Sequence, residues 1–105
     1  SQWGELVGFE NHSGLTYLGP TTQPMGHVRV GRGNNGRDGT EGAILKHAVG
    51  CYLHGSLLPK NPALADWLIA AGIGRDRGPV ELPPLIDDLE IVAHASAVDR
   101  AVKTR

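Results

Sequence analysis

The hydrophobic pattern changes its period partway along the chain, and this change limits the folds that the chain can adopt. Up to about residue 55, apolar residues occur in short runs of strand-forming types, separated by turn formers such as Asn35-Gly36 and Asp38-Gly39. After Asn61-Pro62, which predicts a helix start, apolar residues such as Leu64 and Leu68 recur at helical spacing. The chain should therefore form an α/β unit with several strands followed by two helices. A freestanding doubly wound sheet would instead interleave helices with strands.

The expected elements follow from local patterns of residue types. We expect short strands over residues 3–9, 15–18, 27–30, 41–45 and 47–53. The first helix should start at Asn61-Pro62 and end at Gly72, with a polar connector over 75–84 after it. A second helix should carry an apolar stripe made of Leu85, Leu89, Val92, Ala93 and Ser96. Charged residues that match the helix dipole at its two ends are Asp87, Asp88, Glu90, Arg100, Lys103 and Arg105.

Length, charge and cysteine content exclude several classes of function. The chain has 105 residues and a formal net charge of −1, so it carries no basic footprint for nucleic acid. The single cysteine, Cys51, excludes an internal disulfide and fits a reducing compartment, so we expect a cytoplasmic protein. No apolar run approaches the roughly 18 residues of a membrane span. Because the chain begins at Ser1 without an initiator Met, we expect residues upstream of it to be missing.

Residues 31–36 (GRGNNG) match the G-x-G-x-x-G pattern of dinucleotide-binding loops. That fingerprint requires a helix directly after the glycines, because the helix N-terminus receives the pyrophosphate. Here residues 37–42 continue the turn chemistry and lead into another expected strand. We therefore interpret the glycines as a flexible loop between two strands rather than as a nucleotide site.

Cys51 and His54 invite comparison with the thiolate–imidazole pairs of catalytic cysteines. Within one strand, residues three apart point to opposite faces and lie about 10 Å apart, beyond hydrogen-bond reach. Only a sharp bend between them would bring them together. Cys51 also lies between Val49 and Leu53 on the apolar face, so we interpret it as a packed, unreactive side chain.

His54 differs from the other histidines in its position. It falls where a strand should end, ahead of a helix start, and α/β enzymes place functional residues at such strand ends. His27, His47 and His94 are interpreted as surface or strand-face residues, and the scattered histidines predict no metal site. A second polar cluster, Glu10-Asn11-His12, stands at another strand end, and turn chemistry alone would explain it.

Several segments together resemble the class I glutamine amidotransferases of the cobyric acid synthase type. Residues 8–16 (GFENHSGLT) are similar to that family's G-[YF]-E-x-H-x-G-x-T signature. Residues 50–55 (GCYLHG) are similar to its G-T-Y-L-H-G motif, with Cys51 in place of the usual Thr. Residues 33–42 and 57–66 resemble one branch of the family, the glutaminase subunits of lipid II isoglutaminyl synthases. The matches extend from residue 8 to about residue 69.

This resemblance implies a flavodoxin-like domain that hydrolyses glutamine through a cysteine thioester. In the family, a nucleophilic cysteine on a G-x-C-x-G elbow attacks the glutamine carboxamide, and His54 occupies the position of the histidine that activates it. Ammonia leaves, and water hydrolyses the thioester to glutamate. A Mur-ligase-like partner subunit then uses ammonia and ATP to amidate the D-glutamate of lipid II in peptidoglycan synthesis. ATP and Mg²⁺ are expected on that partner, and no cofactor is expected in this chain.

The sequence departs from the family pattern in two places. It has no G-x-C-x-G elbow, so we expect residues 1–105 to be the C-terminal portion of a single amidotransferase domain whose upstream half, with the nucleophile, is absent. Alone, this portion should be inactive. The acid of an H-x-E arrangement is also missing, because Gly55-Ser56 follows His54. Either a dyad operates or a carboxylate comes from elsewhere, such as the partner subunit, and Glu10 and His12 are candidates for a supporting role.

Two alternatives stay open from the sequence. A relative of cobyric acid synthase would amidate a corrinoid side chain, which is the same chemistry on another acceptor. The other alternative is a non-catalytic interaction module, since the chain alone should be inactive. For part of a domain, the sheet edges and apolar surface left uncovered also predict self-association.

Overall fold

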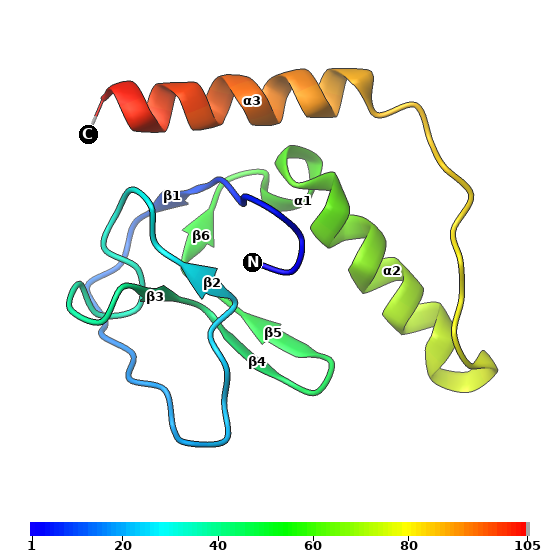
Figure 1. Cartoon of the computed structure of the whole chain (residues 1–105), viewed down its shortest axis with the longest axis horizontal. Helices are drawn as coiled ribbons and strands as arrows, with labels where there is room; N and C mark the ends of the chain where they lie inside the picture. Colours follow the sequence, from blue (N-terminus) through cyan, green and yellow to red (C-terminus); the bar gives the residue numbers. More distant parts are fainter. Residues whose placement is uncertain (105) are drawn as a thin grey trace.

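The computed structural model describes residues 1–104, and Arg105, one of the basic residues expected at the end of the last helix, lies outside them. Strands come first and helices last, as the change of period predicts (Figure 1). The strands are β1 (Phe9–Glu10), β2 (Gly26–His27), β3 (Thr40–Glu41), β4 (Ala43–Leu45), β5 (Ala48–Gly50) and β6 (Leu53–His54). The helices are α1 (Leu57–Lys60), α2 (Pro62–Arg77) and α3 (Asp88–Lys103).

The described strands form three antiparallel pairs: β1 with β6, β2 with β3, and β4 with β5. The strand expected over 41–45 is divided, because the buried Gly42 has a φ of 73° between β3 and β4. The strand expected over 47–53 is likewise divided at Cys51-Tyr52. The strand expected over 27–30 starts one residue early and is shorter. Short local pairs therefore replace the longer strands that the sequence predicts.

The prediction of strands over 3–9 and 15–18 is wrong except at β1. The Asn61 side chain bonds both main-chain groups of Val7, accepting from its N–H and donating to its carbonyl oxygen at 2.8 Å each. The Thr16 N–H donates to the carbonyl oxygen of Asn34, and its carbonyl accepts from the Asn35 side-chain amide. Residues outside strands thus form the hydrogen bonds with these main-chain groups that a neighbouring strand would otherwise have formed.

The helical half contains one helix more than the sequence predicts, because α1 forms a single turn before α2. The start of α2 at Pro62 agrees with prediction, but its expected end at Gly72 is wrong. Gly72 has open space around it and sits inside the helix, which continues to Arg77. Gly78, with a φ of 78°, ends the helix instead, because glycine adopts that left-handed conformation at little cost. The connector therefore starts at residue 78 rather than 75.

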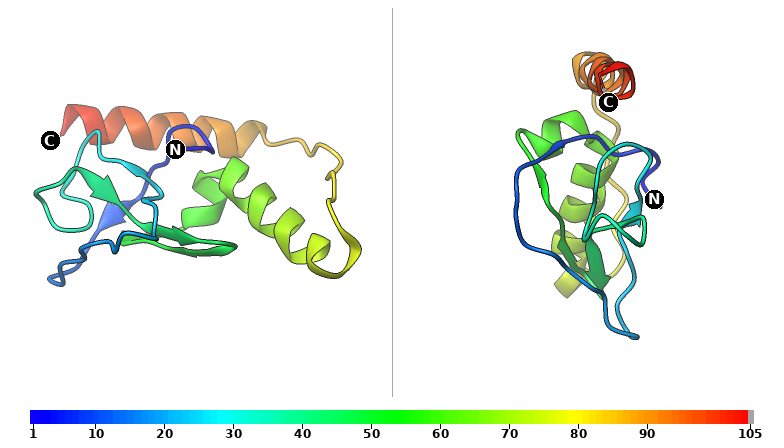
Figure 2. Two further views of the ribbon diagram at one scale, coloured as in Figure 1. Left: turned by 60° about the horizontal axis from the view of Figure 1, so that its bottom comes forward. Right: turned by 90° about the vertical axis from the view of Figure 1, so that its left-hand side faces the viewer.

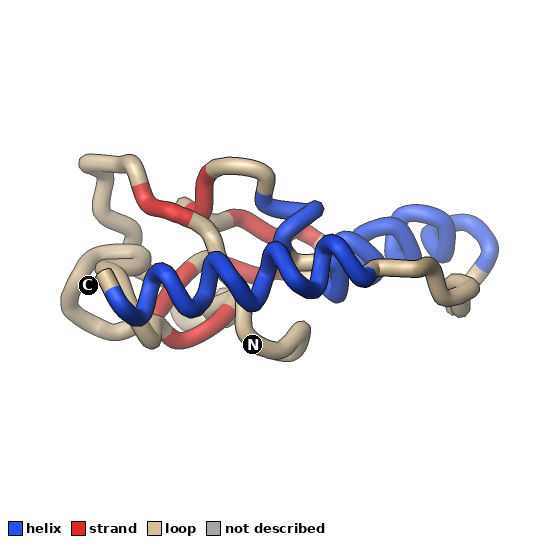
Figure 3. Tube along the Cα trace, turned by 90° about the horizontal axis from the view of Figure 1, so that it is seen from above, coloured by secondary structure: helices blue, strands red, loops and turns tan. Residues whose placement is uncertain are grey.

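The last helix, α3, runs along one side of the molecule and meets the rest near α1 (Figures 2 and 3). The His94 Nδ1 atom lies 2.6 Å from the carbonyl oxygen of Lys60 at the end of α1. The predicted apolar stripe points outward, since Leu89 is 82% and Val92 67% exposed. The helix forms as predicted from Asp88 onward, but Leu85, which was expected in its stripe, lies in the connector before it. The stripe does not pack on the strands. Among residues 1–104, no helix combines the length and apolar character needed to cross a membrane.

Buried polar side chains hold the strand region together as much as apolar ones do. Within residues 1–104, the buried apolar side chains are Val7, Met25 and Leu64. The buried polar side chains are Asn34, Asn35, Glu41 and Asn61. The molecule is flat, with extents of 40 × 35 × 18 Å. A thin molecule of this size buries few side chains completely, so hydrogen bonds carry much of its architecture.

Candidate active site

The short β1–β6 pair joins the two sequence motifs around His54. Phe9 lies opposite His54, and Glu10 lies opposite Leu53. Because directly opposed residues of an antiparallel pair share a face, Phe9 and His54 point to one side. Their rings lie 6.0 Å apart at 35°, and His54 is exposed. The imidazole is therefore held at the surface on a paired strand, open to groups that approach from outside.

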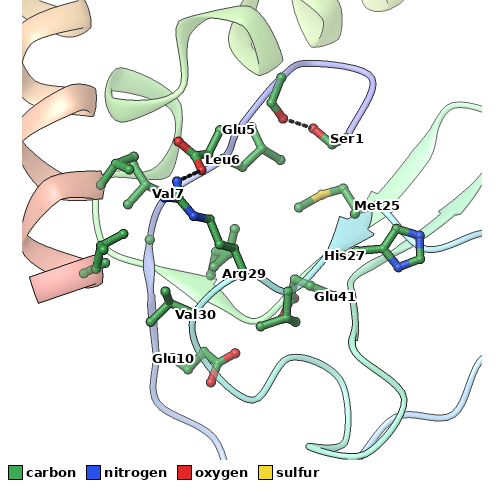
Figure 4. Close-up of a pocket in the computed structure, with 18 residues that line it drawn as sticks. Ser1, Glu5, Leu6, Val7, Glu10, Met25, His27, Arg29, Val30 and Glu41 are labelled. Carbon is green, nitrogen blue, oxygen red and sulfur yellow. Dashed lines mark hydrogen bonds and ion pairs between the residues drawn. The ribbon is translucent and has the colours of Figure 1, made fainter. Parts of the chain in front are cut away.

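A cavity of about 430 Å³ lies on the other side of this strand pair (Figure 4). Glu10 and Leu53 line it, whereas Phe9 and His54 do not, as the alternation of side chains along a strand requires. Most of the remaining lining is apolar and includes Leu6, Val7, Met25, Val30, Val98 and Val102. This cavity and the His54 imidazole therefore lie on opposite faces of the β1–β6 pair.

Tyr52, directly before β6, is held by three residues from two segments, the GFENHSGLT motif and β3. Its ring stacks on His12, with the ring centroids 3.6 Å apart and the planes at 2°. Its hydroxyl group lies 2.8 Å from Thr16 Oγ1, within hydrogen-bond distance. Its N–H donates to Glu41 Oε1, also at 2.8 Å. Two of these partners lie in or next to the GFENHSGLT motif, so the motif fixes the chain that leads to His54.

The two residues expected to support His54 stabilise loops. The Glu10 carboxylate accepts the N–H groups of Arg32 and Gly33, at 3.0 and 2.5 Å. The His12 Nδ1 atom lies 2.9 Å from the carbonyl oxygen of Gly14, and its ring carries the stack on Tyr52. Both side chains therefore lie next to β1, and His12 approaches the chain of His54 through Tyr52.

Main-chain N–H groups of the glycine-rich loop form hydrogen bonds within the molecule. Besides the two amides that Glu10 accepts, the Asn34 N–H donates to the carbonyl oxygen of Thr40, and the Gly36 N–H to that of Arg32. The next element is the strand β3, not a helix. The interpretation of residues 31–36 as a loop between strands is confirmed. No helix N-terminus follows the described loop, and the amides named above are already bonded within the molecule, so they are not available to a phosphate.

The lone cysteine has the properties of a packed thiol. Cys51 is half-buried, and burial raises its pKa, with a smaller contribution from the negative charge of Glu41. A raised pKa keeps the thiol protonated, the opposite of what a nucleophilic cysteine needs. A break in the strand does separate Cys51 from His54, but no hydrogen bond joins their side chains in the part of the chain that the structure describes.

The remaining histidines lie apart from His54. His27 is exposed at the end of β2, and His47 is exposed in the β4–β5 turn, 6.1 Å from the Trp67 ring. His94 differs from its predicted surface position, because it is half-buried against α1. In residues 1–104, no group of three or more His, Cys, Asp or Glu side chains is arranged to bind a metal ion.

The sequence motifs singled out His54, Glu10 and His12 as candidates, but not Tyr52 or Glu41, which the structure places in contact with each other. Glu41 is only 8% exposed, and its second oxygen, Oε2, has no hydrogen-bond partner among the described residues. A polar residue after a turn is normally a surface residue, so its burial depends on the whole arrangement of loops around it. The available signal was its place in residues 38–42 (DGTEG), which resemble one branch of the family but gave Glu41 no role of its own.

The motifs that the strand pairing brings together define a class of protein. Residues 1–62, more than half of the chain, match the family model of the CobB/CobQ-like glutamine amidotransferase domain. The chain therefore belongs to this family, and the described residues give a class I amidotransferase-like domain with mixed strands and three helices. The resemblance inferred from the motifs is confirmed.

Within that class, the chain is similar to subunits of one enzyme. It is 42% identical over 99 residues to the lipid II isoglutaminyl synthase (glutamine-hydrolyzing) subunit GatD of Staphylococcus aureus (strain N315). It is 39% identical over 83 residues to the GatD subunit of Streptococcus pneumoniae (strain ATCC BAA-255 / R6). The matches cover 94% and 78% of this chain. They cover 40% and 32% of those relatives, so the chain spans well under half of their length.

Proposed function

We propose that this chain supplies the catalytic histidine, His54, of a glutaminase that releases ammonia from glutamine for amidation of the D-glutamate of lipid II. The observation that carries the proposal is the exposed His54 at the end of β6, fixed to the GFENHSGLT motif by the β1–β6 pair. The similarity to two subunits whose names describe a glutamine-hydrolysing lipid II isoglutaminyl synthase supports this substrate and this acceptor.

In the proposed reaction, His54 moves protons for a cysteine nucleophile. It takes the proton of the thiol, and the thiolate sulfur bonds to the carboxamide carbon of glutamine. The imidazolium gives that proton to the departing nitrogen as the C–N bond breaks, and ammonia leaves. His54 then takes a proton from water, the resulting hydroxide attacks the thioester, and the C–S bond breaks to give glutamate and the free thiolate.

The nucleophile belongs, in this proposal, to residues other than the 105 of this chain. The one cysteine here, Cys51, is half-buried with a raised pKa and lacks the elbow motif. Residues 1–105 then form the C-terminal portion of one amidotransferase domain, with a flavodoxin-like fold for the domain as a whole. Glu10 and His12 support the site through the loops that they hold.

The proposed acceptor chemistry requires a second subunit. A Mur-ligase-like partner would activate the D-glutamate carboxyl group with ATP and Mg²⁺ and receive the ammonia. Because Gly55-Ser56 follows His54 in place of an H-x-E acid, the imidazole works either as a dyad with the cysteine or with a carboxylate from that partner.

The test is the His54→Ala substitution in the complete glutaminase subunit together with its ligase. Loss of a general acid–base should lower glutamate release at least about 100-fold. His47→Ala, at an exposed hairpin turn, is the matched control and should retain wild-type activity. Glutamine labelled with ¹⁵N in its amide should pass the label to lipid II. Label in a corrinoid, or a His54→Ala enzyme with near-wild-type glutamate release, would contradict the proposal.

A further inference from the structure

We propose that Tyr52 is a positioning residue for His54, held by His12, Thr16 and Glu41 so that the bend before β6 sets where the imidazole points. This inference rests on the proposed glutaminase function of His54. It concerns residues for which neither the motif comparison nor the family match assigns a role.

The chain before His54 lacks the support of a continuous strand. β5 ends at Gly50 and β6 begins at Leu53, so Cys51 and Tyr52 belong to no strand pair. β6 itself has two residues and pairs only with β1. A strand this short cannot fix its own direction, so the residues at its start must be held by other contacts.

Three contacts meet at Tyr52, two from the GFENHSGLT motif and one from β3. The His12 ring covers one face of the Tyr52 ring in a parallel stack with a centroid distance of 3.6 Å. Thr16 holds the far end of the side chain through the hydroxyl group. Glu41 holds the main chain through the N–H. Ring plane, side-chain tip and main chain are therefore all restrained, which leaves the bend little freedom to rotate.

The burial of Glu41 argues that its contact to Tyr52 is specific. A buried carboxylate with an unpartnered oxygen costs free energy, because water no longer solvates it. Glu41 lies 8% exposed with Oε1 on the Tyr52 N–H and Oε2 unpartnered within residues 1–104. An apolar side chain in that position could pack as well as glutamate does. What glutamate adds is a charged acceptor for the Tyr52 N–H.

Tyr52 acts through the chain rather than on the reaction. It lies two residues before His54, and its ring and hydroxyl group are occupied by His12 and Thr16. A small displacement of a catalytic group lowers the rate strongly, since a shift of about 1 Å can cost about 100-fold. A change at Tyr52 should therefore reduce kcat while glutamine binding stays intact.

The test compares Tyr52 variants in the complete glutaminase subunit with its ligase. Tyr52→Leu removes both the stack and the hydroxyl contact and should lower kcat at least about tenfold, with the KM for glutamine changed less than about twofold. Tyr52→Phe keeps the stack and should lower kcat only about threefold, the scale of one hydrogen bond. Tyr17→Leu is the matched control, because Tyr17 is 60% exposed, and it should behave as wild type.

The outcomes separate this inference from the function on which it rests. A folded Tyr52→Leu enzyme with wild-type kcat, or one whose loss appears only in KM, overturns the positioning role alone. A wild-type enzyme that releases no glutamate overturns both proposals. If Tyr52→Leu does not fold, Tyr52→Phe and Thr16→Val decide, since each deletes the same hydroxyl contact. Equal small losses in kcat support the role, and wild-type kcat in both overturns it.

Discussion

The Asn61 side chain makes three hydrogen bonds at the start of α2, two with Val7 and one with the carbonyl oxygen of Leu57. It is 2% exposed, and it satisfies the main chain of a residue 54 positions earlier. Asn35 does the same for the loop after Thr16. At the scale of single residues, buried amides rather than large apolar side chains connect distant parts of the sequence.

Cys51 provides a prediction at this scale. Because burial raises its pKa, the native thiol should react with iodoacetamide several-fold more slowly at pH 8 than the thiol of the urea-unfolded chain. A thiol pKa raised by folding stabilises the protein fully below the unfolded pKa, and the contribution disappears as the pH rises through the folded value.

Two measurements check this prediction. Alkylation rates in native and unfolded samples give the first comparison, and the free energy of unfolding at alkaline pH gives the second. Cys51→Ala should remove the cysteine's part of the alkaline decrease. Native alkylation as fast as in urea would show that the thiol is neither packed nor protonated.

The sequence was informative at this scale where a motif named the residue. His54, Glu10 and His12 lie where the motif order predicts, around one strand pair. The GCYLHG motif contains Tyr52 but gave it no role, because that role depends on contacts to residues 36 and 40 positions away in the chain. Asn61 was predicted as a helix cap, yet its side chain bonds Val7 instead. The position was correct and the partner was not, since local propensity carries no information about long-range partners.

At the scale of elements, the loop between β2 and β3 depends on left-handed glycines. Gly33 has a φ of 69°, and a Cβ atom there would overlap the carbonyl oxygen of Thr40 and the Val28 side chain. Gly39 has a φ of 73° but open space around it. The two positions therefore separate the cost of backbone conformation from the cost of crowding.

We predict different losses of stability for alanine at these two glycines. Gly39→Ala should cost about 1 kcal/mol, the penalty for placing a side chain in the left-handed region. Gly33→Ala should cost more than about 3 kcal/mol, because the loop must also shift. Urea unfolding followed by circular dichroism measures both, and equal losses would mean that crowding at Gly33 is unimportant.

The elements themselves were predictable in kind and order, but their lengths were not. The change from strand to helix patterns and the start of α2 follow from composition and turn residues. The strands are shorter because Gly42 and the Cys51-Tyr52 bend interrupt them. Gly42 is a local signal for a break, whereas nothing local distinguishes Cys51-Tyr52 from continuous strand. Gly72 and Gly78 show the same difficulty, since a helix tolerates one glycine and ends at the other.

At the scale of the whole molecule, α3 leaves an apolar stripe on the surface. Leu89 and Val92 are 82% and 67% exposed, on the side of the helix away from His94, and Leu85, in the connector before α3, is 75% exposed. Exposed stripes of this kind promote association between molecules. We predict that the 105-residue chain associates in a concentration-dependent way.

Light scattering after size-exclusion chromatography measures that association. The double substitution Leu89→Gln and Val92→Gln should reduce it and leave the free energy of unfolding within about 0.5 kcal/mol, because both side chains lie outside the packed region. Val98→Gln is the comparison, since Val98 lines the cavity and its substitution should reduce stability. A monomeric wild-type chain at high concentration would contradict the prediction.

The bond between Asn61 and Val7 also has a meaning for how this protein can change. Both hydrogen bonds involve main-chain groups of Val7, so any residue with an N–H at position 7 could form them. The bonds themselves do not depend on the side chain at that position. Position 61 carries the whole specification, because only a carboxamide on a single methylene offers an acceptor and two donors at that reach. The connection between the first segment and the helices therefore depends on the side chain of Asn61 and on the main chain of Val7. Substitutions that keep a buried apolar side chain at position 7 should therefore preserve this connection, whereas a single change at residue 61 separates the first segment from the helices.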